Sequence, residues 1–190
     1  MKTMKTNMMK VLLSMTLLAL ILPACTQSGN ETSKKGATTA PDMDIHTAIL
    51  YGDLEVVKKH IEAGTDLNSK EPMGGSTPLI SAATFDKQEI AQALIDAGVD
   101  LTIKNNDGST ALHCAAFFCR VEIVQMLINA NADKSITNNY GATAKEIVTG
   151  PFAEIKPVYE MMQQQLGPLG LNLDMAELEE ARPVIATMLQ

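Results

Sequence analysis

The sequence predicts an all-α protein in which pairs of short helices repeat along the chain and stack on one another. One observation is a motif that begins at three threonines spaced 33 residues apart: Thr77, Thr110 and Thr143. A second is a glycine two residues before each of them: Gly75, Gly108 and Gly141. A third is that each period holds two helical patterns of apolar residues, followed by related sequences at 63–66, 97–100 and 130–133. Such a period, with two short helices and a glycine-containing turn, is typical of repeat proteins.

The first 24 residues have the pattern of a secretory signal peptide. Three lysines give the start of the chain a positive charge: Lys2, Lys5 and Lys10. The run from Val11 to Leu22 that follows is almost entirely apolar. A membrane-spanning helix needs about 20 apolar residues, so this run is too short to be one.

The apolar run ends in Leu-Pro-Ala-Cys at residues 22–25, which resembles the lipobox of bacterial lipoproteins. The resemblance implies that residues 1–24 are removed and that Cys25 carries acyl chains. The remainder of 25–42 is rich in Ser, Thr, Gly and Lys, which predicts a flexible tether. Thr26 after the cysteine resembles the outer-membrane default, so we expect a lipid-anchored protein of the cell envelope, in the outer membrane and facing the periplasm or the cell surface. A plain secretory peptide with an incidental cysteine is the alternative.

The repeats are expected to occupy residues 43–150. Their expected boundaries give three full repeats and the start of a fourth: about 43–76, 77–109, 110–142 and 143–150. A single helix pair cannot bury its apolar face, so neighbouring repeats must cover residues such as Leu94 and Leu127. Three repeats are the minimum for a stable stack.

These repeats resemble the ankyrin repeat. The resemblance is strongest from Asp107 to Ala116 and in the Val-Glu-Ile-Val sequence at 121–124. It implies an ankyrin-repeat solenoid of three to four helix-turn-helix repeats, each with a β-turn finger. It also implies a structural role for His113, as a hydrogen-bond partner of Thr110 and of the backbone of a neighbouring repeat.

Two departures from the family pattern lead to expectations. Ankyrin repeats usually place a left-handed glycine between their two helices, and Gly52 keeps it, but Asp86 and Cys119 stand at the equivalent places. Cys tolerates this conformation poorly, so Cys119→Gly is expected to stabilise the domain. His60 stands where the later repeats have leucine, so the first repeat is expected to be a cap with its outer side facing water.

Residues 151–190 leave the repeat pattern and are expected to form a helical cap on the C-terminal end of the stack. Phe152 to Leu166 is expected to be helical, with Pro157 near its start or at a break. Gly-Pro-Leu-Gly at 167–170 predicts a turn, and the helix after it is expected to be broken or kinked at Pro183. A separate binding element is the alternative for this segment.

The sequence shows no arrangement of residues for catalysis, and no cofactor is expected. It has three histidines, no phosphate-binding glycine loop with a lysine, and no Gly-x-Ser-x-Gly motif. His113, Cys114 and Cys119 lie close in sequence, but a fourth ligand for zinc is missing nearby and Cys114 takes a core position. The helix and turn between the two cysteines are expected to hold their Cα atoms beyond the roughly 7 Å limit for a disulfide, although an oxidising compartment would permit one.

The partner-binding surface is expected at the positions that ankyrin repeats use for recognition. These are the last two residues of each first helix and the tips of the fingers. In this sequence they hold Leu50, Tyr51, Thr84, Phe85, Phe117 and Phe118 at helix ends, and Met73, Lys104, Asn106, Asn139 and Tyr140 on fingers. Five of the seven aromatic residues belong to this set, and aromatic side chains are enriched in binding hot spots. The alternative is that the aromatic residues fill a packing seam.

Charge limits the class of partner. The chain has 15 basic and 22 acidic residues, a formal charge of −7 that removal of the signal peptide with its three lysines changes to −10. This balance opposes binding to nucleic acid and weakly favours a basic protein. We therefore expect a non-enzymatic protein–protein interaction module, tethered by lipid to the bacterial cell envelope. The alternative function is a dedicated accessory, inhibitor or immunity-like factor for one envelope enzyme.

Overall fold

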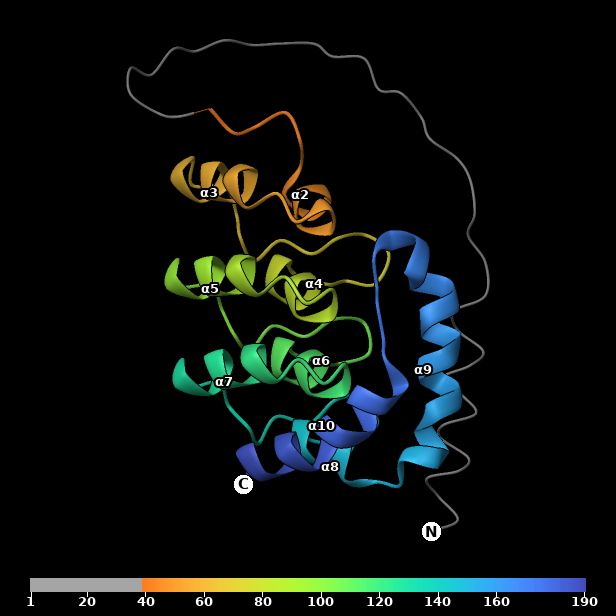
Figure 1. The fold of residues 1–190 in the computed structure, drawn as a ribbon. Helices are drawn as coiled ribbons and strands as arrows, with labels where there is room; N and C mark the ends of the chain where they lie inside the picture. The colour runs from red at the N-terminus through yellow and green to blue at the C-terminus, as the bar shows by residue number, and fades with distance from the viewer. Residues whose placement is uncertain (1–38) are drawn as a thin grey trace. The chain divides into compact units, whose positions relative to one another are not determined.

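Helices of the chain pair in sequence order, and the pairs stack in register (Figure 1). The structure is a computed structural model that describes residues 39–190; the expected signal peptide, Cys25 and most of the expected tether lie outside this part. The three pairs are α2 and α3 (Ile45–Tyr51, Leu54–Glu62), α4 and α5 (Pro78–Thr84, Gln88–Asp96), and α6 and α7 (Ala111–Phe117, Val121–Asn129). The helix α8 (Ala144–Thr149) begins a fourth repeat, so the predicted all-α solenoid is confirmed.

The recurring threonine is the N-cap of α4, α6 and α8, and Asp44 takes this place at the start of α2. The hydroxyl of Thr77 accepts a hydrogen bond from the backbone N–H of Ile80 at 3.3 Å. Thr143 forms a reciprocal capping box with Glu146, and Thr110 forms one with His113. Because these caps satisfy backbone donors at the helix starts, they position every first helix in the same way.

The turn inside each pair requires a left-handed residue, as expected from the sequence. The φ angles are 72° at Gly52, 53° at Asp86 and 56° at Cys119. Asn131, which follows the third pair where the first two have glycine, is also left-handed, at 61°. Because the turns share this left-handed geometry, the helix pairs are equivalent in structure, even where the residue in the turn tolerates a positive φ poorly.

His60 corrects one expectation from the sequence, because it is buried and does not face water. Its Nδ1 lies 3.0 Å from the hydroxyl of Thr65, and its Nε2 lies 2.8 Å from the carbonyl oxygen of Met43. The chain that enters α2 thus reaches the imidazole. Both ring nitrogens have partners, so a polar side chain is tolerated at a position that holds leucine in later repeats.

The C-terminal segment continues with α9 (Phe152–Leu166), a short 3-10 helix η1 (Gly167–Leu169) and α10 (Met175–Met188). Both α9 and α10 run through their prolines, so the break considered at Pro183 is absent. Proline removes one backbone donor, but Arg182 and Ile185 are buried on either side of Pro183 and hold the helix in place.

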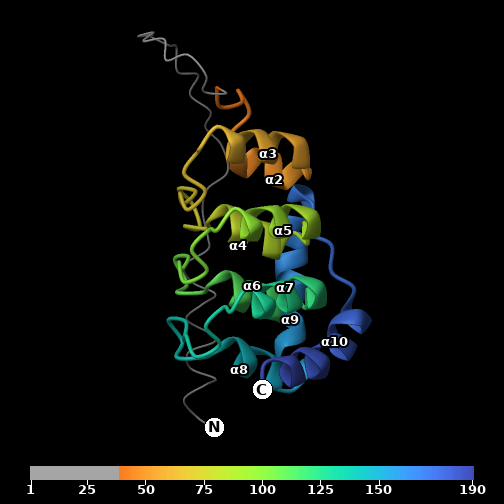
Figure 2. The ribbon, with the colours of Figure 1, turned by 90° about the vertical axis from the view of Figure 1, so that its left-hand side faces the viewer.

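The two long C-terminal helices take different places. The helix α10 packs on α7 and α8 at the end of the stack, where Ile185 and Leu189 join the main hydrophobic core. By contrast, α9 runs along the stack on the side of α4 and α6, opposite α5 and α7 (Figures 1 and 2). Within the described residues, no helix is both long and apolar enough to cross a membrane.

Candidate protein-interaction surface

The helix-end residues expected to bind a partner fall into an open and a covered group. Tyr51, at the end of α2, is 78% exposed. At the ends of α4 and α6, Phe85 and Phe117 are half-buried, and Phe118 is only 5% exposed. The same repeat position therefore faces solvent in the first repeat and is covered in the third.

The cover is the C-terminal segment. A second hydrophobic cluster, separate from the main core, has five buried members: Phe118, Tyr159, Leu171, Leu173 and Leu178. The ring of Phe117 packs 4.8 Å from that of Tyr159 and 4.9 Å from that of Phe118, measured between centroids. The aromatic residues of the second and third repeats thus do fill a packing seam, but one against α9 and the residues that follow it.

The fingers lie side by side along one edge of the stack (Figure 2). Two residues expected to bind a partner join them. The amide of Asn106 donates to the carbonyl of Met73 at 3.0 Å, and the amide of Asn139 donates to the carbonyl of Asn106 at 2.9 Å. Both bonds span 33 residues, so Asn106 and Asn139 form a ladder that fixes the spacing of the fingers.

The glycines of the fingers allow this ladder to form. Gly75 and Gly108 have φ angles of 69° and 73°. A Cβ atom on either would overlap the side-chain oxygen of the asparagine on the next finger, Asn106 or Asn139. Glycine is therefore required at these positions for a left-handed turn and for close approach.

The other finger residues differ in exposure. Met73 is 76% exposed and Tyr140 is 44% exposed. The ammonium group of Lys104 donates to the carbonyl oxygen of Thr137 at 2.9 Å, so this cation bridges two fingers. A role in partner binding stays a prediction for all of these residues.

A buried arginine, which the sequence analysis did not single out, joins three helices. Arg182 on α10 is 3% exposed. Its guanidinium donates to the carbonyl oxygens of Ile147 and Gly150, at 3.3 and 3.0 Å, and to the hydroxyl of Tyr159 at 3.0 Å. That hydroxyl in turn donates to the carbonyl oxygen of Phe117 at 2.7 Å. The network connects α6, α8, α9 and α10. The partners of Arg182 lie 23 to 35 residues away in the chain, so no local sequence pattern indicates these bonds.

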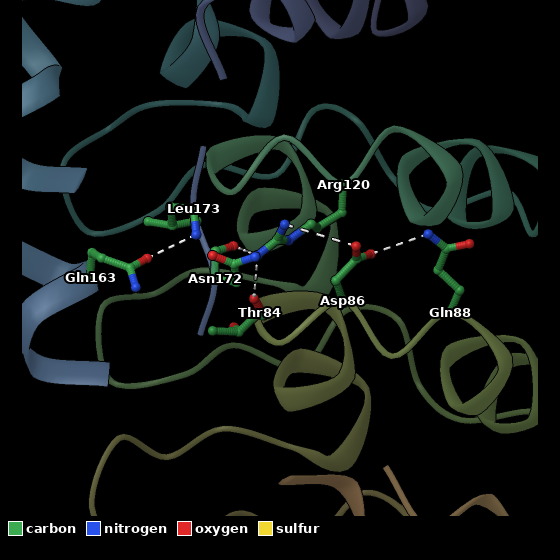
Figure 3. A network of polar contacts seen from close by, with 7 residues as sticks. All are labelled: Thr84, Asp86, Gln88, Arg120, Gln163, Asn172 and Leu173. Atoms are coloured by element: carbon green, nitrogen blue, oxygen red, sulfur yellow. Dashed lines mark hydrogen bonds and ion pairs between the residues drawn. The ribbon is translucent and has the colours of Figure 1, made fainter. Parts of the chain in front are cut away.

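Arg120 forms a second link between the repeats and the C-terminal segment (Figure 3). One guanidinium nitrogen donates to the carbonyls of Thr84 and Asn172, at 3.4 and 3.2 Å, and another lies 3.9 Å from the carboxylate of Asp86. Gln163 on α9 accepts from the N–H of Leu173 at 2.8 Å. A cavity of about 360 Å³ lies beside this network, lined by both apolar and charged side chains.

The cysteines and His113 have structural surroundings. Cys114 and Cys119 are free thiols, and burial raises the pKa of Cys119 to about 11 and that of Cys114 to about 12. Both are thus protonated at neutral pH, which is the unreactive form of a thiol. His113 lies 2.8 Å from the hydroxyl of Thr110 and 3.2 Å from the carbonyl of Ala142, so its expected structural role is confirmed. Among residues 39–190, no three potential metal ligands gather in one place.

Comparison with known proteins identifies the repeated region. Residues 45–138 match the family model for ankyrin repeats, in three copies. The chain is 36% identical over 74 residues to human DNA-binding protein RFXANK, and 41% identical over 64 residues to ankyrin repeat-containing protein P1E11.10 of Schizosaccharomyces pombe. It is also 36% identical over 58 residues to chicken inversin.

The matched segments make up 39%, 33% and 30% of this chain. They cover 28%, 29% and 5% of the respective relatives. The chain thus spans less than a third of the length of these relatives.

Proposed function

The chain carries three ankyrin repeats, and on this premise we propose that it is a non-enzymatic module that binds a protein partner through its first helices and fingers. One observation supports this most directly. Tyr51 and Met73 are the two most exposed large apolar side chains in the described part of the chain, and both occupy recognition positions of the repeat. Exposed apolar side chains of this size are typical of interaction sites.

The charge of the chain favours a protein over a nucleic acid. The human relative is named a DNA-binding protein, but this chain has a formal charge of −7. Phosphate groups would be repelled by such a surface, because DNA binding depends on neutralisation by Lys and Arg. The proposed partner is therefore a protein, with a weak preference for a basic one.

The proposed location is the bacterial cell envelope, through a lipid on Cys25. The support is the sequence at 22–25 and the polar stretch after it, which lie almost entirely outside the described residues. Mass spectrometry of the purified protein should find acyl groups on the peptide that begins at Cys25. Cys25→Ala should move the protein out of the membrane fraction; an unmodified cysteine in a membrane-free protein would contradict the tether.

Partner capture tests the interaction surface. Crosslinking in intact envelopes, followed by purification, should recover a partner with the wild-type chain. Tyr51→Ala and Met73→Ala should each lower recovery several-fold, because truncation of a binding hot spot typically costs more than about 1 kcal/mol. Val184→Ala is the control, since Val184 is an exposed apolar residue of α10 away from the recognition positions.

One result of the capture experiment would contradict the proposed binding surface. Equal recovery with Tyr51→Ala, Met73→Ala and the control, all with unchanged melting temperatures, would remove these residues from the binding surface. The number of partners also discriminates between two roles. Several partners indicate a general scaffold, whereas a single envelope enzyme indicates a dedicated accessory or inhibitor.

A further inference from the structure

Residues 151–174, here named the strap, cover the recognition positions at the ends of α4 and α6. We propose that the strap is an intramolecular competitor for this site: it opens as a unit while the repeats stay folded, and the site then binds an extended partner peptide with leucine-like side chains two residues apart. The proposal deepens the proposed function and rests on it. Three features of the structure support it.

The strap is anchored at both ends to helices that contribute to the main core, although Arg182 and Leu178 of α10 also contact the strap or its cluster. The helix before it, α8, contributes Val148 to the main core, and the helix after it, α10, contributes Ile185 and Leu189. The buried residues of the strap belong instead to the second cluster. Opening of the strap therefore exposes one small cluster and leaves the main core intact, as expected of a local opening unit.

The strap is held on the repeats by few contacts. Tyr159 is the one fully buried residue among the fifteen of α9. Its hydroxyl donates to the carbonyl of Phe117, and Arg120 donates to the carbonyl of Asn172. Pro157 inside α9 lacks the N–H that would complete the helix at that turn. Few buried contacts and few hydrogen bonds give a low free energy of local opening.

The end of the strap lies on the site in the manner of a bound peptide. Leu171 and Leu173 are buried, and Asn172 between them is exposed, which is the alternation of an extended chain. Its backbone is held by side chains: Gln163 donates to the carbonyl of Leu171 and accepts from the N–H of Leu173. Arg120 from the repeats supplies the bond to the carbonyl of Asn172 (Figure 3).

The residues of the strap that fill the site indicate which partner peptide could replace them. A peptide that replaces the strap must present two aliphatic side chains on the same side, two residues apart, with a carbonyl group between them for Arg120. Gln163 leaves the site together with the strap, so the bond from Arg120 and the burial of the two side chains supply the affinity, and the two side-chain positions also supply the specificity. The exposed middle residue is free to vary.

Cys119 is a built-in reporter of strap opening. Its side chain packs against the second cluster, to which Tyr159, Leu171 and Leu173 of the strap belong. Cys114 lies in the main core and reports unfolding of the repeats. Under native conditions, pulsed alkylation of the full chain with iodoacetamide should modify Cys119 at least about 10-fold faster than Cys114, with the site assigned by mass spectrometry.

Two variants of the strap and one control variant distinguish local opening from unfolding of the repeats. Tyr159→Phe removes the hydroxyl that joins the strap to Phe117 and Arg182, and loss of a hydrogen bond should raise the labelling rate of Cys119 about 5- to 10-fold without changing that of Cys114. Leu173→Ala removes a buried side chain of the strap from the second cluster and should act in the same direction. Tyr140→Phe on a finger is the control and should change neither rate. A single common rate for both cysteines in every variant would show that the strap opens only by global unfolding, which overturns the proposal.

Binding of a peptide in trans tests the second half of the proposal. The probe is a labelled peptide with the sequence of residues 169–175, and the control peptide has serine in place of Leu171 and Leu173. The Tyr159→Phe chain should bind the probe at least about 10-fold more tightly than the wild-type chain does, and neither should bind the control. Equal binding of both peptides, or no binding to a variant with faster Cys119 labelling, contradicts the peptide site.

The two proposals fail in different ways. An opening strap with no captured envelope partner contradicts the proposed function alone. A captured partner that depends on Tyr51, with a strap that opens only on unfolding, contradicts the competitor alone.

Discussion

Single residues in this protein are constrained chiefly where the backbone is left-handed. Cys119 is the least suitable of them, since a Cβ atom in this conformation costs roughly 1–2 kcal/mol. Its side chain nevertheless packs against both hydrophobic clusters and accounts for part of the contact with α10. The net effect of a substitution is thus a difference between relieved strain and lost packing.

Two substitutions separate these effects at Cys119. Cys119→Gly removes the strain and the side chain, whereas Cys119→Ala removes most of the side chain and keeps the strain. Gly should therefore exceed Ala in free energy of unfolding by about 1 kcal/mol, measured by urea denaturation. The gain of Gly over the wild-type chain should be smaller, because the contacts of the thiol are lost. An alanine variant as stable as the glycine variant would show that the turn carries no strain.

The finger glycines permit a similar comparison. Gly108 and Gly141 have almost the same φ angle, 73° and 75°, but only Gly108 faces a neighbouring asparagine; no atom lies within 4 Å of a Cβ built on Gly141. Gly141→Ala should cost about 1 kcal/mol from the backbone alone. Gly108→Ala should cost more, because the ladder of Asn139 must also move. Equal melting temperatures for the two variants would show that the ladder contributes no close contact.

At the scale of elements, the two long C-terminal helices have different roles, whereas the sequence predicted a single helical cap. The helix α10 completes the main core at the end of the stack, and α9 covers an aromatic surface along its side. Arg182 holds the two helices together, and its charge is buried among carbonyl and hydroxyl oxygens. A buried charge without its partners is costly, so this residue makes the arrangement specific.

Arg182→Met tests the link between the elements. The variant keeps the length and apolar stem of the side chain but leaves the carbonyls of Ile147 and Gly150 and the hydroxyl of Tyr159 without their donor. We expect a loss of about 2–4 kcal/mol in the free energy of unfolding, because several buried acceptors lose a charged partner. Lys156→Met on the exposed side of α9 is the control and should change stability by less than about 0.5 kcal/mol. Similar stabilities for both variants would show that the network is dispensable.

At the scale of the whole molecule, two histidines and two cysteines set the pH range of stability: His113 and Cys114 are buried, and His46 and Cys119 are half-buried. Burial lowers the pKa of His46 and His113 below the ordinary value, so the unfolded chain binds more protons as the pH falls. The free energy of unfolding should therefore decrease as the pH falls below about 6.5. Burial raises the pKa of Cys114 and Cys119, so stability should also decrease as the pH rises above about 8.5.

Urea denaturation between pH 5 and pH 10 measures both limbs. Stability should be greatest between about pH 7 and pH 8.5. His46→Gln should flatten the acidic limb, and Cys114→Ala should flatten the alkaline limb, whatever their effects on stability at pH 7. A flat profile down to pH 5 in the wild-type chain would contradict the lowered pKa of His46 and His113.

Much of the fold is a local property of this sequence. The N-caps, the left-handed turns and the apolar periodicity recur every 33 or 34 residues, so each full repeat specifies the same helix pair and the same stacking. The ladder of Asn106 and Asn139 follows the same period and could have been found from it. These features can be predicted from the sequence because the interacting residues occupy equivalent positions of neighbouring repeats.

Only the tertiary structure decided what covers the repeats. The sequence by itself determined the helix pairs and their register, and it left open whether the aromatic residues bind a partner or fill a seam. The answer depends on Tyr159, Leu171 and Leu173, which meet Phe117 and Phe118 across more than 40 residues of chain. Such contacts have no period and no fixed spacing, because they arise when a segment outside the repeats folds back on them. The same fold leaves Tyr51 open and covers its equivalent in the third repeat.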